Sequence, residues 1–178
     1  AMAFGEIFAA PSSYGESLDA PALKASLATI GRLGGLATIH AEEAMPGSPS
    51  DLATHNRLRG PAGETRAVNR IAGWQHHCHI HFCHLSTASA VAAAGSASVE
   101  VTPHHLYLSY EQALETDTSC KVNPPLRTET ERRRLWSVWE RIDVIASDHA
   151  PHTMQEKSVP FPDAPSGIPG VETMLPLL

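Results

Sequence analysis

The feature that most constrains the fold is an alternation of short β-type runs with helical patterns. Runs rich in β-branched or apolar residues occupy positions 36–40, 80–84, 98–102 and 142–146. Short runs of this kind are typical of buried strands. Between them, apolar residues recur three or four positions apart, as on one face of a helix. This βαβα order predicts an α/β fold in which helices cover a parallel sheet.

Local signals predict where several helices begin. A helix is expected to follow Asp19, with Pro21 in its first turn. Pro61 is expected to begin a second helix for the same reason. Thr128 and Glu131 have the spacing of a capping box at the start of a third. These signals place one helix before the run at 36–40, one between the runs at 36–40 and 80–84, and one between the runs at 98–102 and 142–146.

Two stretches, 44–60 and 153–169, show neither period, and we expect them to be irregular. The sequence shows no internal repeat and no linker. At 178 residues, with 42% apolar residues, the chain suits one globular domain over residues 1–178.

Charge and cysteine content exclude some classes of partner. The net charge is −6 and the basic residues are scattered, which argues against nucleic acid and anionic membranes as partners. No apolar run is long enough to cross a bilayer, and the first residues lack the pattern of a signal peptide. Three cysteines without a CxxC spacing indicate reduced thiols. We therefore expect a cytoplasmic protein.

Four chemically active side chains share one position relative to the predicted strands. Glu6, His40, His84 and Asp148 each fall at or just beyond the carboxyl end of a strand. In parallel α/β folds, and above all in (β/α)8 barrels, this edge collects the active-site residues. Two imidazoles and two carboxylates at one rim are suitable ligands for zinc or a similar divalent metal.

Six motifs follow one another in order along the chain. They are HAEE at 40–43, HFCHLST at 81–87, VTPHHL at 101–106, KVNPPLR at 121–127, ASDHAPH at 146–152 and PSGIPGVET at 165–173. Together they resemble the dihydroorotases of the amidohydrolase superfamily. The resemblance extends over nearly the whole chain. Six ordered motifs are far more specific than any one of them.

The resemblance implies a (β/α)8 barrel of the metal-dependent hydrolase type, of which this chain supplies about the last five βα units. It implies that His40 and His84 ligate metal, and that Asp148 both ligates metal and moves a proton as the catalytic residue. Asn123 and His152 match residues that contact the substrate ring and its carboxylate. The implied reaction is the reversible hydrolysis of dihydroorotate to N-carbamoyl-aspartate in pyrimidine biosynthesis.

Two departures from the family pattern concern the metals. The family carries a His-x-His pair followed by an arginine on its first strand, and no such motif stands ahead of Glu6. The family also commonly places a carboxylated lysine or an aspartate between two metals, where this chain has Glu6. We expect one or two zinc ions with at most one held well, and we expect this chain alone to hydrolyse dihydroorotate poorly or not at all.

Several alternatives stay open at this point. A hydantoinase or allantoinase would share the metals and the barrel. An inactive dihydroorotase-like scaffold could partner a transcarbamoylase, and the chain could form a homo-oligomer. The sequence pattern is the same whether this chain is a degenerate homologue or a fragment of a complete enzyme. Glu6 could be a plain polar residue at a strand end, and Asn123, which precedes Pro124, could serve to form a turn.

Overall fold

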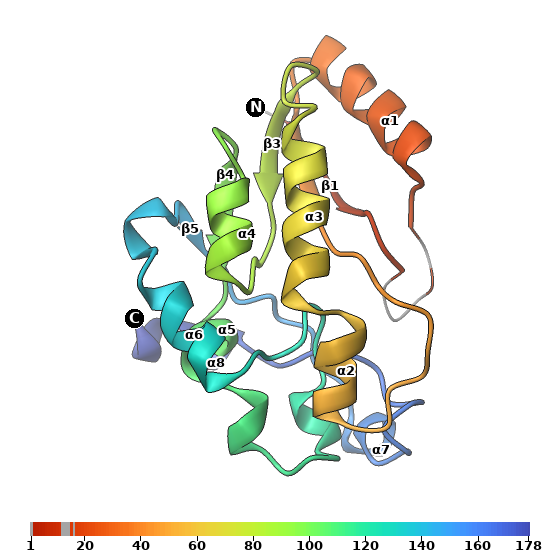
Figure 1. Cartoon of the computed structure of the whole chain (residues 1–178), viewed down its shortest axis with the longest axis vertical. Coiled ribbons are helices and arrows are strands. Elements are labelled where there is room, and N and C mark those ends of the chain that lie inside the picture. Colours follow the sequence, from red (N-terminus) through yellow and green to blue (C-terminus); the bar gives the residue numbers. More distant parts are fainter. Residues whose placement is uncertain (1, 12–14, 16) are drawn as a thin grey trace.

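One parallel sheet organises the molecule, for which we describe residues 2–11, 15 and 17–178 of a computed structural model (Figure 1). Its five strands are β1 (Ala3–Phe8), β2 (Leu36–His40), β3 (His79–Phe82), β4 (Ser98–Val101) and β5 (Val144–Ile145). They lie in the order β1-β2-β3-β4-β5, and every neighbouring pair is parallel. The predicted α/β fold with a parallel sheet is confirmed, although β5 is shorter than the run at 142–146 suggested.

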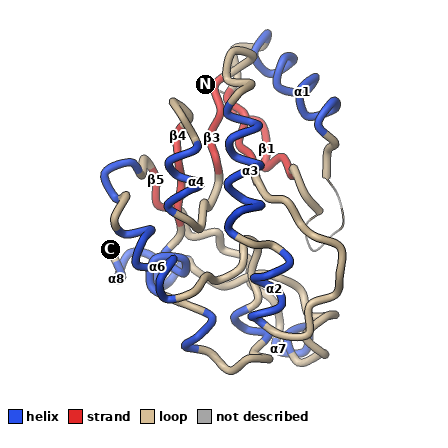
Figure 2. Tube along the Cα trace, viewed as in Figure 1, coloured by secondary structure: helices blue, strands red, loops and turns tan. Residues whose placement is uncertain are grey.

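Helices cover one face of this sheet, as the ribbon and the tube show (Figures 1 and 2). These are α1 (Ala20–Arg32), α3 (Pro61–Ala72), α4 (Ala88–Ala93) and α6 (Glu129–Trp136). Shorter helices and loops gather beyond the end to which the strands point, namely α2 (Leu52–Leu58), α5 (Pro103–Tyr107), α7 (Met154–Lys157) and α8 (Val171–Leu177). Short helices and loops therefore cover the carboxyl ends of the strands.

The two faces of the sheet differ in chemistry because successive side chains of a strand point in opposite directions. The face under the helices is apolar and fully buried, and it includes Ile39, Phe82 and Val99. Buried side chains of α1 and α3 pack against it and complete the core. The other face is polar and carries Thr38, His81, Ser98 and Glu100. Barrel interiors are commonly filled by branched apolar side chains, so this polar layer departs from the usual pattern.

The helix starts predicted from local signals are largely confirmed. Asp19 caps α1 by accepting a hydrogen bond from the Ala22 backbone N–H at 2.8 Å. Helix α3 begins at Pro61. Thr128 caps α6, where its hydroxyl accepts from the Glu131 N–H at 3.2 Å. The Glu131 carboxylate binds Arg134 at 2.7 Å, so it pairs within the helix and only the first half of the capping box forms.

The expectation that residues 44–60 and 153–169 are irregular throughout was wrong. The first stretch contains α2, whose cap is Asp51, which accepts a hydrogen bond from the Thr54 N–H at 2.7 Å. The second contains α7, where Thr153 and Glu156 form a complete capping box. Both helices are too short for the apolar period to be visible in the sequence, and their caps are what define them.

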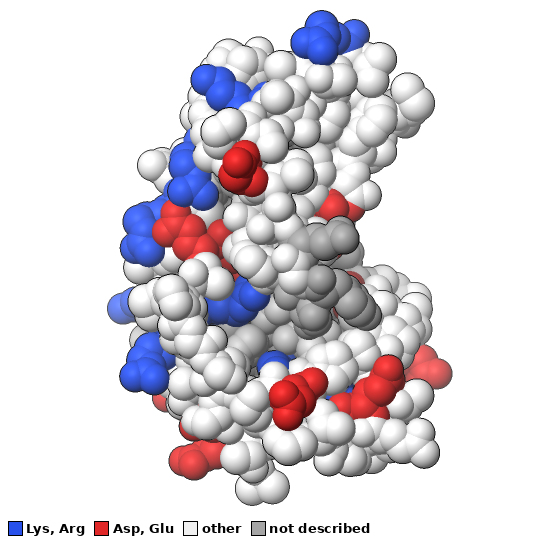
Figure 3. Space-filling view, turned by 90° about the vertical axis from the view of Figure 1, so that its right-hand side faces the viewer, with Lys and Arg blue, Asp and Glu red and all other residues white. Residues whose placement is uncertain are grey.

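The surface carries charges of both signs. On the face drawn in Figure 3, basic side chains run along one edge beside acidic ones, and the outline is indented at mid-height. Within the part of the chain described, no helix has both the length and the hydrophobicity needed to cross a bilayer.

Candidate metal centre

Three strands deliver the central side chains to the same rim of the sheet. His40 is the last residue of β2, and His84 follows β3 by two residues. Asp148 lies three residues beyond β5. The backbone φ angles of His84 and Asp148 are +35° and +43°, in the left-handed region, so the chain turns sharply at both positions. The predicted placement of these three residues on the carboxyl rim of a parallel sheet is confirmed.

Glu6 reaches the rim from inside a strand, which corrects the expectation that it lies at a strand end. It belongs to β1, where the pairing with β2 shifts register between Phe4 and Ile7. This irregularity is the kind of local kink that re-aims a side chain. Sequence periodicity carries no signal for such a shift.

The Glu6 carboxylate and two imidazole rings meet at one point. Its Oε1 atom lies 2.6 Å from His84 Nε2 and 3.3 Å from His40 Nδ1. The two ring centroids are 4.7 Å apart, and one ligand atom from each residue lies within 4.8 Å of the others. Both histidines are almost fully buried, at 2% and 3% exposure. The three residues therefore form a compact N, N, O cluster.

Asp148 and Asn123 face the same small cavity as the cluster. The cavity has a volume of about 160 Å³ and is lined by Glu6, Phe8, His40, His84, Val122, Asn123, Asp148, Ala150, Ser166 and Gly167. The Asn123 Oδ1 atom is buried and has no hydrogen-bond partner in the described part of the chain. Buried acceptors are rarely left without a donor, so this oxygen is available to a ligand.

His152 lies behind the cavity wall. Its Nε2 atom is 3.2 Å from the Ser166 carbonyl oxygen, and a side chain at Gly167 would collide with its ring. His152 is not among the residues that line the cavity. It contacts the loop that forms the wall, and the prediction that it touches substrate stays untested.

The electrostatics of the cluster favour a bound cation. Burial by itself would raise the pKa of Glu6, but hydrogen bonds from His40 and His84 hold it well below its usual value. Burial opposes the charged form of His84, but the hydrogen bond and charge of Glu6 outweigh it and raise the pKa of His84 to about 9. Burial raises the pKa of Asp148. The charged Glu6 carboxylate thus demands positive charge beside the buried histidines, which a proton or a metal ion can supply.

The surroundings of His40 also suit a metal ligand. Its Nε2 atom is 2.6 Å from a carboxylate oxygen of Glu42, which in turn accepts a hydrogen bond from Arg59 at 2.7 Å. An imidazole whose far nitrogen donates to a carboxylate has its near nitrogen free to bind metal. Here the near nitrogen is Nδ1, which faces Glu6 and His84. The residues present therefore fit a divalent metal such as zinc.

Glu42 and Arg59 are site residues that the sequence patterns did not single out. The signal was present in part, because Glu42 stands two residues after His40 within the HAEE motif. Nothing local pointed to Arg59, which comes from the end of α2, seventeen positions from Glu42.

Comparison with curated proteins shows extended similarity to dihydroorotases. The chain is 41% identical to a dihydroorotase of Halobacterium salinarum over 188 aligned positions, which cover 99% of this chain and 44% of the relative. It is 37% identical to a dihydroorotase of Methanosarcina acetivorans, again over 99% of this chain and 43% of the relative. The chain thus spans less than half the length of the relatives it matches. No family model matches it.

Solved structures agree on the fold. A D-hydantoinase (dihydropyrimidinase) from Thermus sp. superposes with a TM-score of 0.83 at 22% identity, over 97% of this chain and 43% of that one. An L-hydantoinase (dihydropyrimidinase) from Arthrobacter aurescens gives 0.82 at 24% identity, over 96% and 44%. This likeness concerns the fold: the five parallel strands correspond to part of a (β/α)8 barrel. The chain is therefore similar in sequence, over nearly its whole length, to one part of the dihydroorotases, and its fold is that of part of the hydantoinase structures.

Proposed function

We propose that this chain carries the metal centre of a cytoplasmic, zinc-dependent cyclic amidohydrolase that converts dihydroorotate reversibly to N-carbamoyl-aspartate in pyrimidine biosynthesis. One observation carries the proposal: the Glu6 carboxylate and the His40 and His84 rings meet at the carboxyl rim of a parallel sheet. The curated relatives that match 99% of the chain are named dihydroorotases, which supports this substrate.

Glu6, His40, His84 and Asp148 would hold the ion. A divalent cation there supplies Lewis acidity toward a carbonyl oxygen and makes water acidic enough to react near neutral pH. Neutral imidazoles leave most of the cation's charge uncompensated, which suits this chemistry. Glu42 keeps His40 in the tautomer whose Nδ1 lone pair faces the centre.

Asp148 is the residue that we assign to proton transfer. Hydrolysis adds the water oxygen to the amide carbon, breaks the C–N bond and moves one proton from the water to the departing nitrogen. The Asp148 carboxylate lines the cavity beside the cluster, where it can accept that proton and return it. Its raised pKa, caused by burial, brings it closer to the working pH of such a group.

Asn123 and His152 are the proposed substrate contacts. The unpartnered Oδ1 of Asn123 can accept a hydrogen bond from a ring N–H, and its NH₂ group can donate to a ring carbonyl. His152 would reach the substrate carboxylate after a small movement of the loop at Ser166, which its ring now contacts.

Ring opening by the zinc-loaded chain tests the proposal. We expect zinc-dependent hydrolysis of dihydroorotate that is slow compared with the roughly 10 per second of a median enzyme. Hydantoin and allantoin, assayed in parallel, should react more slowly still. Faster opening of either ring would favour the hydantoinase or allantoinase alternative. Zinc binding without turnover of any ring would indicate an inactive scaffold, and association with a transcarbamoylase would then be the property to measure.

A further inference from the structure

Two lysines tie the loop that follows α7 (Figure 1) to the segment that contains Asn123. The first is Lys121, whose side chain is only 5% exposed. Its ammonium group donates to three main-chain carbonyl oxygens, those of Phe161 at 2.7 Å, Pro162 at 3.2 Å and Ala164 at 2.6 Å. An ammonium group has three N–H donors, so Lys121 uses all of them on this loop.

The second is Lys157, the last residue of α7, which binds main-chain oxygens on both sides of the same junction. Its ammonium group donates to the carbonyl oxygens of Thr118 at 3.0 Å, Lys121 at 3.3 Å and Pro165 at 2.8 Å. The Lys121 carbonyl oxygen also accepts from the Gly167 N–H at 2.8 Å. The loop at 158–167 is thereby fastened to the segment at 118–123.

Both fastened segments line the cavity beside the candidate metal centre. Asn123 comes from the segment at 118–123, and Ser166 and Gly167 come from the loop. The loop also lies tightly against the chain after β5, because a Cβ at Gly167 would be 2.5 Å from the Ala150 carbonyl oxygen. The position of the loop therefore sets the width of the cavity.

The loop has little regular structure of its own to hold it there. Residues 158–167, all of which are described, form neither helix nor strand, so their carbonyl groups need other donors. Burial lowers the pKa of Lys121 and lowers that of Lys157 to about 8, which shows that both ammonium groups are partly removed from water. Buried ammonium groups bound to carbonyl oxygens fix one arrangement of the backbone around them.

We propose that Lys121 and Lys157 are positioning residues, which hold Ser166 and Gly167 as one wall of the substrate cavity. They act through the loop and do not touch the substrate. The inference rests on the proposed function, because it takes this cavity as the place where the cyclic amide binds. Without either lysine the loop moves away and substrate binding weakens. The metal centre is unaffected, since its ligands come from other segments.

Amide hydrogen exchange tests the anchoring directly and needs no turnover. In Lys121→Met the amides of residues 158–167 should exchange at least about ten-fold faster than in the wild type, because the anchored loop then opens more often. Lys24→Met is the matched control, since Lys24 lies at an exposed position of α1. Equal exchange of the loop in the two variants would overturn the proposal.

Steady-state kinetics separate positioning from a general loss of stability. Lys121→Met should raise the KM for dihydroorotate about ten-fold, with a smaller change in kcat, because the loss falls on substrate binding. Zinc affinity, measured by competition with a chelator, should stay unchanged. A loss of zinc affinity as large as the rise in KM would refute the assignment, because the lysines would then support the whole fold and not the cavity wall.

Lys157 provides a second pair of variants at a half-buried position. Lys157→Met should show the same pattern as Lys121→Met, and it decides the matter if Lys121→Met fails to fold. Lys157→Arg keeps the charge and the donors and should restore most of the substrate affinity. No difference between these two variants would contradict the role of the ammonium group. If the wild-type chain opens no ring, the proposed function fails, and loop exchange alone then decides whether the lysines hold the wall.

Discussion

His40 and Glu42 form a hydrogen bond of 2.6 Å between an imidazole nitrogen and a carboxylate oxygen, although their side chains are only 2% and 1% exposed. Burial alone would raise the pKa of Glu42, but the bond to His40 and the nearby charge of Arg59 outweigh it and lower that pKa to about 2. A charged carboxylate thus fixes the orientation of the ring from behind. The metal-facing geometry of His40 depends on a residue that would never touch the metal.

The first prediction follows from this pair. Glu42→Gln should weaken zinc binding at the cluster of Glu6, His40 and His84 about ten- to a hundred-fold. The amide still accepts a hydrogen bond, but it no longer carries the charge that strengthens the imidazole as a ligand. Competition with a chromophoric chelator measures the affinity. Glu43→Gln is the matched control, since Glu43 pairs with Arg66 and Arg70 at the surface. Equal zinc affinities for the Glu42→Gln and Glu43→Gln variants would show that Glu42 does not support metal binding.

The second prediction concerns Asp148. Asp148→Asn should reduce zinc-dependent turnover by at least about a hundred-fold, because an amide cannot take up and return the proton. Zinc should remain bound, since Glu6, His40 and His84 are unchanged. Turnover and zinc content are measured on the same preparation. Asp143→Asn, at a half-exposed position before β5, should leave both unaffected. Turnover that survives in Asp148→Asn would assign proton transfer to another residue.

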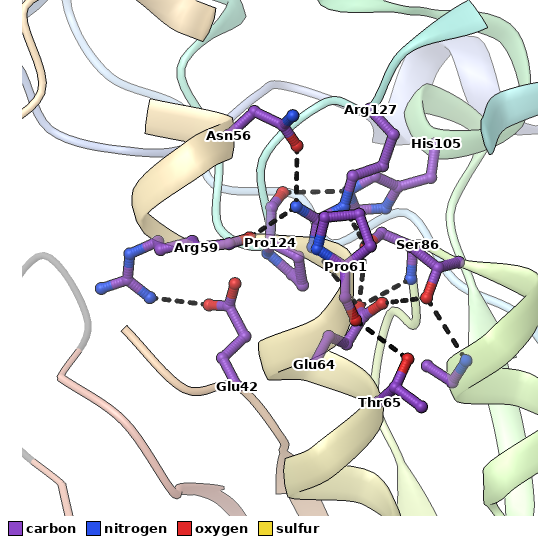
Figure 4. Close-up of polar contacts among 12 residues, drawn as sticks. Glu42, Asn56, Arg59, Pro61, Glu64, Thr65, Ser86, His105, Pro124 and Arg127 are labelled. Atoms are coloured by element: carbon purple, nitrogen blue, oxygen red, sulfur yellow. Dashed lines mark hydrogen bonds and ion pairs between the residues drawn. The ribbon is translucent and has the colours of Figure 1, made fainter. Parts of the chain in front are cut away.

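A buried polar network joins α3 to the segment after β3 (Figure 4). The Glu64 side chain has no exposed surface and accepts hydrogen bonds from the Ser86 N–H at 2.9 Å, the Ser86 hydroxyl at 2.7 Å and the Thr87 hydroxyl at 2.5 Å. The Arg127 guanidinium lies 3.9 Å from it and donates to Ser86 and to Asn56. The network thereby links the KVNPPLR segment to α2, to α3 and to the segment after β3.

The third prediction concerns the contribution of this network to the stability of the fold. Glu64→Ala should lower the free energy of unfolding by about 3–5 kcal/mol, because it leaves a buried guanidinium and three donors without their acceptor. Urea unfolding followed by tryptophan fluorescence gives the value. Glu43→Ala removes a surface partner of two arginines and should cost less than about 1 kcal/mol. Similar losses of unfolding free energy in Glu64→Ala and Glu43→Ala would show that the buried network stabilises the fold no more than a surface ion pair does.

The fourth prediction is a dependence of stability on pH through His55. Burial lowers the pKa of His55 to about 4, against about 6.5 in an unfolded chain. The unfolded chain therefore binds a proton first as the pH falls. Stability from this residue is complete above pH 6.5 and is lost on acidification toward pH 4, at up to about 1.4 kcal/mol per pH unit.

Comparison of two variants isolates that contribution. His55 donates to the Val122 carbonyl at 3.0 Å, and His55→Gln retains a donor but cannot titrate. The variant should lose the extra slope between pH 6.5 and 4, measured by urea unfolding at a series of pH values. His79→Gln, at an exposed position, should keep the wild-type slope. An unchanged slope in His55→Gln would place the acid sensitivity elsewhere.

The sequence determined the architecture because its signals are local or periodic. Alternating apolar runs fixed the strands and their parallel order, and capping residues such as Asp19 and Thr128 fixed helix starts. Strand order in turn placed His40, His84 and Asp148 on one rim, since parallel strands all end at the same edge. The ordered motifs carried the resemblance to the dihydroorotases for the same reason, as each is a short contiguous segment.

Only the tertiary structure decided which side chains meet. The register shift in β1 aims Glu6 at His84 across 78 positions of sequence, and the fold brings Arg59 against Glu42 and Glu100 against the backbone of His84. Each contact depends on the angle and separation of elements that are distant in the chain. Hydrogen bonds tolerate errors of only a few tenths of an ångström, and periodicity specifies a face but not a distance. The sequence therefore determined which residues reach the rim, and the packing of the elements decided which of them touch.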